Sequence, residues 1–331
     1  MKKVIQIIRS NEWRENKLCP LLALGYATTL FSTTPLYKVA VWLLFLLISI
    51  IIGAVYVSVI NDITDLEDDL ASGKRNRMAE ISAGYRWMIP VFCLVLGILF
   101  ILFFFKDNLS RLLYLLPWIS FSLYSFPPIR LMKRGIWGVF SDACGSQLFV
   151  SLLMVANVSR FTGIQVDWYW FTSVGIWSFF YGLRGILWHQ FNDRDNDLKA
   201  NLGTFASRGD PRSFRIPSMI LFAIEGSAFI FMMIRMSVAL VFIFLILYLM
   251  LAFIRYRKWN QRIIFIIAPD KLPYQIFMLD YYQLFFPVSL LIFAAYSQPK
   301  AWIVLLVHVI LFNTSIRKAG KDLLAVRNEA E

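Results

Sequence analysis

The chain is poor in the residues that bind soft metals. Its 331 residues include three cysteines and two histidines, and Cys19, Cys93 and Cys144 stand far apart. Because they fit no metal-ligand spacing, we interpret all three as ordinary residues of apolar segments. Acidic residues are also few, with 21 Asp and Glu against 33 Lys and Arg. Any metal site in this chain is therefore expected to use oxygen ligands.

Apolar stretches make up most of the sequence. Hydrophobic residues form 59% of it and the mean hydropathy is +0.63, which excludes an ordinary soluble protein. No soluble domain or low-complexity linker interrupts them, and the basic start leads into the first apolar segment without a signal-peptide cleavage site. We therefore expect one integral-membrane domain over residues 1–331, with an amphipathic cytoplasmic lead-in at 1–17 and a charged tail at 317–331.

Ten apolar segments approach the roughly 20 residues that a helix needs to cross a bilayer. Serines and threonines interrupt the first, so the expected fold is an all-α polytopic membrane bundle of nine helices, or ten if the first segment spans. The apolar segment at 263–279 is split by Asp270 and Lys271, and we expect it at the membrane interface. The predicted spans are 18–36, 38–60, 87–106, 108–126, 135–157, 168–191, 213–234, 236–254, 278–297 and 300–316.

Basic residues predict the orientation of these spans. With ten spans and an inside N-terminus, 26 of the 33 Lys and Arg residues lie on the inside, as the positive-inside rule requires. We expect the N-terminus and both acidic segments, 61–69 and 189–197, to face the cytoplasm of a bacterial or archaeal cell. The net charge of +12 then reflects topology and attraction to anionic membrane lipids and phosphate, and it needs no nucleic-acid partner.

The first acidic segment, residues 61–69, directly follows the apolar run at 41–60. Three aspartates recur at i, i+3 and i+7, which places them on one face of a helix that extends from the span. An asparagine lies at the edge of that face as a neutral oxygen donor, whereas Glu67 and Asp68 are expected to point elsewhere into solvent. The residues that share the face are Asn61, Asp62, Asp65 and Asp69.

The second acidic segment, residues 189–197, follows the apolar run at 168–188 and has a similar stripe, with Asp195 on the opposite side. Two unit charges about 4 Å apart interact by roughly 4 kcal/mol at an effective dielectric near 20, so crowded carboxylates favour a bound cation. Oxygen ligands at this density suit Mg²⁺ completed by phosphate oxygens, and their recurrence suggests two halves that face a common cavity. The stripe consists of His189, Gln190, Asp193 and Asp197.

Lysines and arginines follow the acidic segments on the same side of the membrane. Their side chains are the charge-assisted donors that a diphosphate needs. Arg130 and Lys133 come after the turn at Pro127-Pro128, which fixes their position more closely than topology alone would. The other candidates are Lys74, Arg77 and Lys199.

These segments resemble, in order, the motifs of the UbiA superfamily of intramembrane prenyltransferases. Residues 61–69 fit its N-D-x-x-D-x-x-x-D signature, and 124–134 look like its Y-S-x-P-P-x-R-x-K-R loop. Met78 stands where the family's K-x-N-R-P…S-G stretch has proline. Asn201 stands at the glycine of its D-x-x-x-D…G-x-x-T motif, and asparagine also tolerates a left-handed backbone. The matching residues are Lys74, Asn76, Arg77 and Gly84 in the former motif and Asp193, Asp197 and Thr204 in the latter.

The resemblance implies a helical bundle around a central cavity. It implies Mg²⁺-dependent transfer of an isoprenyl or polyprenyl group from its diphosphate to a small lipophilic, aromatic acceptor, with release of diphosphate. The implied metal ligands are Asn61, Asp62, Asp65, Asp69, Asp193 and Asp197, of which Asp65 and Asp193 would be catalytic. The implied diphosphate ligands are Lys74, Arg77, Arg130, Lys133 and Lys199, and the implied acceptor ligands are Tyr124, His189 and Gln190.

Two other functions stay open. The same superfamily includes enzymes that join a phosphoribosyl group to polyprenyl phosphate, and Arg9, Trp13 and Asn16 faintly resemble the amino-terminal motif of that branch. Ser10 and Glu15 replace its proline and lysine, and the full second aspartate pair favours isoprenyl diphosphate. A cation-coupled transporter would place acids along a path across the membrane, whereas these acids collect on one side.

A few polar residues lie inside the predicted spans. An unpaired Arg184 would be costly there, and Asp142 is its expected partner. Glu225 and His308 are expected to make hydrogen bonds between helices. His189 either orients or deprotonates an acceptor hydroxyl, or serves as a partner of the aspartate one turn later.

Overall fold

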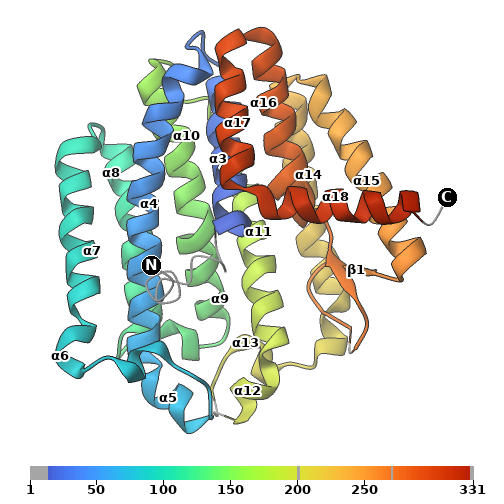
Figure 1. Cartoon of the computed structure of the whole chain (residues 1–331). Coiled ribbons are helices and arrows are strands. Elements are labelled where there is room, and N and C mark those ends of the chain that lie inside the picture. The colour runs from blue at the N-terminus through green and yellow to red at the C-terminus, as the bar shows by residue number, and fades with distance from the viewer. Residues whose placement is uncertain (1–13, 200–201, 270, 329–331) are drawn as a thin grey trace.

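The computed structural model describes residues 14–199, 202–269 and 271–328. Within these ranges the chain folds into a bundle of long helices, with short helices at one end and a small sheet at one side (Figure 1). Most of the predicted lead-in lies outside the described residues. So do four residues that the sequence analysis discussed, namely Arg9, Trp13, Asn201 and Asp270.

The bundle is built from helices that run along a common direction. Their bounds are α3 Cys19–Thr29, α4 Leu36–Thr64, α7 Met88–Leu99, α8 Asn108–Ser125, α9 Ile136–Ala143, α10 Phe149–Thr162, α11 Trp168–Asn192, α14 Arg215–Met236, α15 Ala239–Trp259, α16 Phe286–Ser297 and α17 Trp302–Leu311. Short helices are α5 Leu66–Ala71, α6 Ala83–Arg86, α12 Arg194–Lys199 and α13 Phe205–Arg208, and α18 Asn313–Asn328 follows the bundle.

Tighter and wider helical turns extend or join these helices. The π-helical turns are η1 Arg14–Leu18, η3 Phe100–Phe104, η5 Cys144–Leu148 and η7 Tyr281–Phe285. The 3₁₀ turns are η2 Arg77–Glu80, η4 Leu131–Lys133, η6 Pro211–Phe214 and η8 Pro299–Ala301. Because η5 joins α9 to α10, the predicted span at 135–157 is one continuous helical rod.

Five helical stretches are long and apolar enough to cross a membrane, at 36–64, 83–104, 136–162, 211–236 and 239–259. A sixth counts if the helices on either side of Phe312, which are bent by 80°, form one span. The all-α polytopic prediction is confirmed, and the number of nine or ten spans stays a prediction. The segment predicted as a span at 300–316 is not one straight helix, since α18 leaves the bundle direction there.

Apolar side chains cover the outside of the bundle as well as its core. Phe103 is 70% exposed and Phe253 is 61% exposed, whereas α3 is buried along its whole length. Two of the threonines that interrupt the first predicted span, Thr28 and Thr29, lie in that buried helix, where Thr28 donates to Leu24 O at 2.7 Å and accepts from Trp170 Nε1 at 3.0 Å. Their polar groups are satisfied inside the protein, so the low hydropathy of this segment does not conflict with a place in the bundle.

The segment expected at the membrane interface forms a two-stranded parallel sheet. Strand β1, Arg262–Ile264, pairs with β2, Tyr274–Ile276. Arg184 of α11 anchors the sheet, because its guanidinium donates to Phe265 O at 3.3 Å and to Phe277 O at 3.1 Å. Within the described residues, β1 and β2 are the only named elements that are not helical.

Arg184 pairs with Glu225 of α14, so the predicted partner Asp142 was wrong. Its Nη2 donates to Oε1 at 2.8 Å, and both side chains are buried. The prediction failed because Arg184 lies on the face of α11 that packs along α14, which sequence spacing did not reveal. The expected interhelical hydrogen bonds are confirmed for Glu225 by this pair, and for His308 by a 3.1 Å contact with the Tyr26 hydroxyl.

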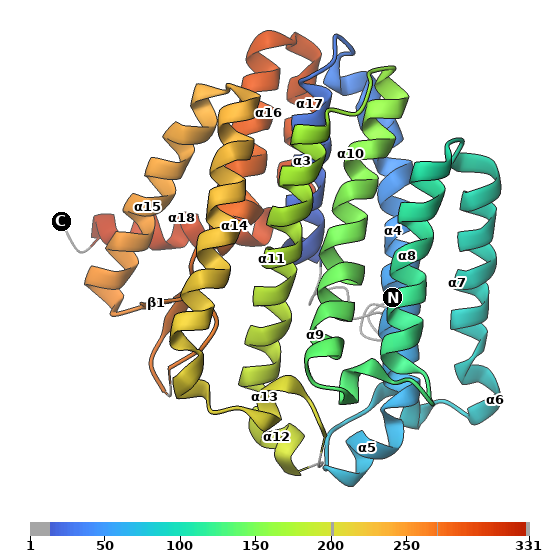
Figure 2. The ribbon, with the colours of Figure 1, turned by 180° about the vertical axis from the view of Figure 1, so that it is seen from behind.

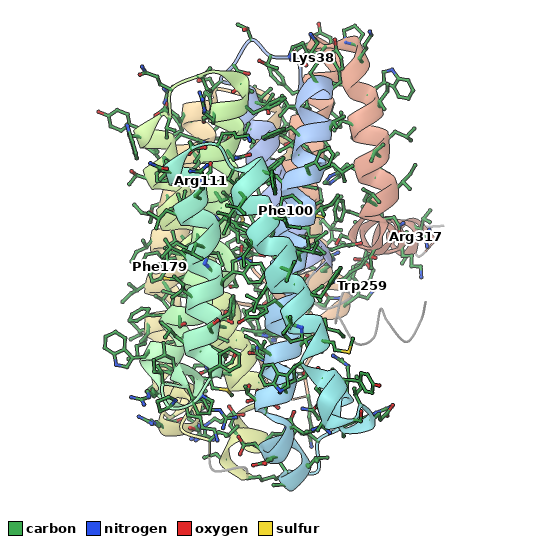
Figure 3. The ribbon with its side chains drawn as sticks, turned by 90° about the vertical axis from the view of Figure 1, so that its left-hand side faces the viewer. Lys38, Phe100, Arg111, Phe179, Trp259 and Arg317 are labelled. Carbon is green, nitrogen blue, oxygen red and sulfur yellow. The ribbon has the colours of Figure 1, made fainter. Side chains whose placement is uncertain are left out.

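The predicted charged tail is helical as far as the described residues reach. Helix α18 runs across the bundle helices, and Arg317 projects from it to the side (Figures 1 and 3). Buried Arg255 of α15 pairs with both Asp280 and Asp322, which ties α18 to the bundle. Glu15 accepts the backbone N–H groups of Thr314 and Ser315, so the start of the described chain contacts the first turn of α18.

Candidate active site

Both acidic segments have the same local structure at a helix end. Helix α4 ends before Asp65, whose φ and ψ are −96° and 0°, and the short helix α5 follows. Helix α11 ends before Asp193, at −98° and 5°, and α12 follows. The predicted continuous helix through the first segment is therefore broken at Asp65. Figure 2 shows α5 and α12 at the same end of the bundle, which we call the site end.

The two segments repeat their hydrogen bonds as well as their shape. Asp69 follows Asp65 by one turn, and Asn76 Nδ2 donates to its Oδ2 at 2.8 Å. Asp197 follows Asp193 by one turn, and Thr204 Oγ1 donates to its Oδ2 at 2.9 Å. Asn76 and Thr204 stand at the same sequence distance from their helix ends, and both are buried. The chain thus contains a structural repeat, in agreement with the expectation of two similar halves.

Side chains connect the two halves directly. Lys74, from the loop after α5, places its Nζ 2.6 Å from Asp193 Oδ2. The Tyr124 hydroxyl, near the end of α8, interacts electrostatically with both Asp65 and Asp197. The loop after α8 also meets the stretch that follows α12, because Gly135 N donates to Gly203 O at 3.0 Å. All three predicted motifs therefore converge at the site end.

The basic loop after α8 binds the first acidic segment. Arg130 Nη2 lies 2.7 Å from Asp65 Oδ1 and 3.0 Å from Asp68 Oδ2, and it also donates to Thr64 O at 2.8 Å. Lys133 Nζ lies 2.7 Å from Asp68 Oδ2. Asp68 was predicted to point into solvent, and these contacts show that it does not. The break at Asp65 turns α5 and brings Asp68 towards the basic loop.

The backbone of Arg130 is held in an uncommon conformation. Its φ is 40° and its ψ is 62°, in the left-handed region that residues other than glycine rarely adopt. Such conformations persist where the surroundings determine them, and they gather at ligand sites. The three oxygen contacts of the guanidinium supply that determination here.

The pKa values of the acids in the two segments are shifted in different directions. Burial raises the pKa of Asp65, and the neighbouring Asp69 and Asp68 add to this effect against the opposing Arg130. Burial likewise raises the pKa of Asp197, with Asp193 adding and Thr204 opposing. A raised carboxyl pKa means that the surroundings disfavour the ionised form, here chiefly through burial.

Asp68 and Asp193 have the opposite shift. Burial alone would raise the pKa of Asp68, but hydrogen bonds and charge from Lys133 and Arg130 lower it overall. At Asp193, burial is likewise outweighed by hydrogen bonds from Lys74 and Asn196, so the pKa is lowered. Each half therefore holds one carboxylate with a lowered pKa beside one with a raised pKa, and in the first half the raised one, Asp65, still pairs with Arg130.

A polar cavity of about 370 Å³ opens between α4 and α11 beside these acids. Asn61 and His189 line it, each one turn before the aspartate that ends its helix. Asp142 and Lys17 also line the cavity. Ser146 Oγ donates to Asp142 Oδ1 at 3.3 Å, and Lys17 and His189 interact with its charge. The sequence analysis did not assign Asp142 or Lys17 to the site, although a lone acid such as Asp142 in an apolar segment was a usable signal.

The remaining predicted residues occupy different surroundings. Asp62 is buried, and its Oδ2 lies 3.8 Å from Arg77 Nη1. Gln190 is buried outside the cavity wall, with its Oε1 accepting from Ala206 N at 3.4 Å. Lys199 is exposed at the end of α12. These three predicted roles therefore have less geometric support than those of the residues that bridge the two halves.

Among the comparisons with known proteins, matches come from solved structures. No protein-family model and no curated protein matches the chain. Solved structures of a UbiA homolog from Archaeoglobus fulgidus do match. The structure bound to GPP and Mg²⁺ has a TM-score of 0.55 at 18% identity, covering 92% of this chain and 99% of that one. The structure bound to Cd²⁺ has a TM-score of 0.58 at 19% identity, covering 88% and 98%.

The chain has the UbiA fold. A third structure of the same homolog, bound to DMAPP and Mg²⁺, agrees with a TM-score of 0.57 at 18% identity, covering 89% of this chain and 98% of that one. Because nearly the whole of both chains is aligned, the likeness extends to the complete UbiA bundle rather than to a few helices.

Within this UbiA fold, the donor set suits a hard cation. Among the residues that the structure describes, no three His, Cys, Asp or Glu side chains lie close enough to form a ready metal site. Carboxylates of the two segments are instead engaged by Lys74 and Arg130. The oxygen ligands and the raised pKa values of Asp65 and Asp197 fit a divalent cation that would draw both segments together.

Proposed function

We propose that the chain is a transferase of the UbiA superfamily that moves an isoprenyl group from its diphosphate to a lipophilic acceptor with the help of Mg²⁺. The observation that carries this proposal is the repeated helix end, which brings two aspartate pairs to one end of the bundle with Lys74 reaching across to Asp193. The GPP, DMAPP and Mg²⁺ bound to the homolog of the same fold support the same chemistry.

The ion pairs at the site end suggest how the substrate enters. Lys74, Arg130 and Lys133 each pair with an aspartate. When a diphosphate and its metal arrive, these cations would turn to phosphate oxygens and release the carboxylates to the metal. The exchange conserves the number of charge contacts, so neither partner is left buried and unpaired. The proposed metal ligands remain Asn61, Asp62, Asp65, Asp69, Asp193 and Asp197.

Ionisation of the substrate follows from this arrangement. The allylic C–O bond breaks and its electron pair stays on the diphosphate oxygen, where Mg²⁺ supplies charge neutralisation. Lys74, Arg130 and Lys133 stabilise the same growing charge through charge-assisted hydrogen bonds. The isoprenyl cation then adds to the acceptor, and the acceptor loses one proton. Exclusion of water from the cavity would protect the cation until that bond forms.

The polar cavity is the proposed acceptor site. His189 lies on its wall one turn from Asp193, within reach of a group that would attack next to the diphosphate. His189 and Asp142 interact electrostatically and are the candidates to orient an acceptor hydroxyl and take its proton. Tyr124, between Asp65 and Asp197, and Gln190 remain proposed acceptor contacts.

The site end is proposed to face the cytoplasm of a multi-pass membrane protein, with residues 1–331 forming one domain. The acids of the two acidic segments lie at one end of the bundle, which supports a transferase over a transporter. Of the residues resembling the phosphoribosyltransferase branch, Asn16 makes structural contacts, with its backbone O accepting from Tyr181 and its Oδ1 from Gln283. These contacts do not favour phosphoribosyl transfer.

Product analysis by mass spectrometry tests the proposal. Purified protein in detergent would be given Mg²⁺ and geranyl, farnesyl or geranylgeranyl diphosphate, together with quinone precursors, tetrapyrroles or glycerol phosphates. A separate reaction would contain phosphoribosyl diphosphate and polyprenyl phosphate. The proposal expects a prenylated product and free diphosphate in the first set. A product only in the second reaction would replace it with phosphoribosyl transfer.

A further inference from the structure

An apolar cavity continues from the polar one into the interior of the bundle. It has a volume of about 110 Å³ and lies between α3, α4, α8 and the turn η5. The two cavities share wall residues, among them Val57, Ser58 and Phe121, so the apolar space begins where the polar space ends. Its position beyond the proposed diphosphate site raises the question of what it holds.

Two helices form the length of the apolar cavity. On α4, Ser58, Ala54 and Ile50 line it on successive turns that lead away from Asn61. At 1.5 Å per residue, Ile50 lies roughly 16 Å from Asn61 along the helix axis. The facing wall is an aromatic stripe on α8 that consists of Phe121, Trp118 and Tyr114. The space therefore has the form of a passage along the two helices.

Tyr114 closes the far end of this passage. Its side chain is buried, and its hydroxyl donates to Ser49 O on α4 at 3.1 Å. Its ring centroid lies 4.7 Å from that of Phe105 and 5.9 Å from that of Trp118. The hydrogen bond across from α8 to α4 and the rings behind it leave Tyr114 little freedom to move aside.

Trp118 makes the side wall equally firm. A Cβ atom placed on Gly97 of α7 would lie 2.9 Å from the Trp118 ring, and one on Gly53 of α4 would lie 3.6 Å from it. The indole therefore fills the space between these two helices. A ligand in the cavity cannot push Trp118 towards α7 without displacing backbone.

We propose that this apolar cavity holds the tail of the isoprenyl diphosphate and that Tyr114 sets the longest tail that fits. The inference rests on the proposed function and adds a determinant of chain length to it. An apolar tail gains free energy in proportion to the surface it removes from water. That gain stops at Tyr114, because a longer tail must break the hydrogen bond to Ser49 and expel a packed ring. The length from Asn61 to Ile50 corresponds to roughly two or three isoprene units.

Equilibrium binding of diphosphates of different lengths tests this proposal without an acceptor. Geranyl, farnesyl and geranylgeranyl diphosphate would be titrated with Mg²⁺ into wild-type protein, Tyr114→Ala and Tyr114→Phe. Longer tails also partition into detergent, so the quantity to compare is the ratio of variant to wild-type affinity at each length. Tyr114→Ala is expected to raise this ratio at least about tenfold for the first tail beyond the wild-type limit, and to leave the shorter tails within about twofold. Tyr114→Phe keeps the ring and is expected to keep the limit.

A second variant changes the cavity in the other direction. The larger side chain of Ala54→Leu would fill part of the passage halfway along its length. This variant is therefore expected to weaken binding of farnesyl diphosphate by about tenfold or more, while binding of geranyl diphosphate is less affected. This result would support the proposal even if Tyr114→Ala failed to fold. If Tyr114→Ala and Ala54→Leu bound the three diphosphates with the same relative affinities as wild-type protein, the tail would lie elsewhere and the inference would be overturned. If wild-type protein bound no prenyl diphosphate with Mg²⁺, the proposed function itself would fail.

Discussion

Replacing Lys74 by glutamine separates the catalytic role of this residue from its role in joining the two halves. Its Nζ lies 2.6 Å from Asp193 Oδ2, and we propose that it turns to the diphosphate during the reaction. A hydrogen bond to a charged group contributes about 1.5–3 kcal/mol. If this contact is made in the transition state, kcat/KM for the diphosphate is expected to fall by roughly 10–150-fold.

The effect of the same substitution on stability is expected to be small. The side chains of Lys74 and Asp193 are 32% and 31% exposed, so water screens their attraction. A partly exposed ion pair of this kind contributes below about 1 kcal/mol, and the melting temperature should change by less than about 4 °C. A large loss of activity with a small loss of stability is the signature to measure, by diphosphate release and by thermal unfolding in detergent.

The pH dependence of that small stability change has a definite sign. Although burial acts in the opposite direction, hydrogen bonds from Lys74 and Asn196 lower the pKa of Asp193 below its ordinary value. A carboxyl whose pKa is lowered by folding stabilises the protein above its unfolded pKa of about 3.9 and loses that effect as the pH falls through the folded pKa. The difference between wild type and Lys74→Gln should therefore be constant near neutral pH and vanish in acid.

Arg75→Gln is the matched control for this prediction. Arg75 is the next residue, and its exposed side chain pairs with Glu80 at 2.8 Å, away from the two acidic segments. Its replacement removes the same charge from the same loop, so kcat/KM should stay within about twofold of wild type. Equal losses in the two variants would mean that Lys74 contributes only to the general positive charge of the loop, and the proposed contact with diphosphate would have to be abandoned.

Three further predictions address the metal and the basic loop. Asp65→Asn and Asp193→Asn should each reduce diphosphate release to near background, whereas Asp195→Asn, on the exposed side of α12, should not; activity retained at saturating Mg²⁺ would contradict the metal site. EDTA should stop the reaction and Mg²⁺ should restore it, because only oxygen ligands are offered; full activity in chelator would refute this. Lys133→Ala should lower kcat/KM for the diphosphate by roughly 10–150-fold while Lys318→Ala stays near wild type, and similar small effects of both would limit Lys133 to topology.

The sequence was sufficient to predict that both acidic segments lie at the same end of the bundle. Asp65 and Asp193 each follow a long apolar segment, and the distribution of lysine and arginine places both segment ends on one side. Crowded carboxylates at the end of a span are costly unless a cation is near, so their recurrence carried information that a single cluster would not. The structure brings both segments to the site end, where Lys74 joins them.

The local partners could not be predicted, because they depend on where helices bend and which helices are neighbours. Asp68 was assigned to solvent by assuming that α4 continues through Asp65. The break at Asp65 changes the direction of the axis, so helical spacing no longer tells which way Asp68 points. Arg184 met Glu225 rather than Asp142 for a related reason, since spacing along one helix does not say which other helix lies against it.

The repeat at the two helix ends is symmetric in backbone but not in charge. Lys74 N donates to Asp69 O at 2.8 Å, and at the equivalent position Leu202 N donates to Asp197 O at 2.8 Å. The first loop therefore places a lysine beside Asp193, whereas the second loop has a leucine at the equivalent position.

Positive charge for the first half comes instead from Arg130, outside the repeat. The cations thus reach the site from the loops after α5 and α8, while the cavity lies between α4 and α11. This asymmetry suits a ligand with two unlike ends, because a diphosphate would face the cations while its tail points towards the apolar cavity that continues from the polar one. A site with equal charge on both halves could not impose that direction, so the unequal loops provide the polarity that the repeated helix ends lack.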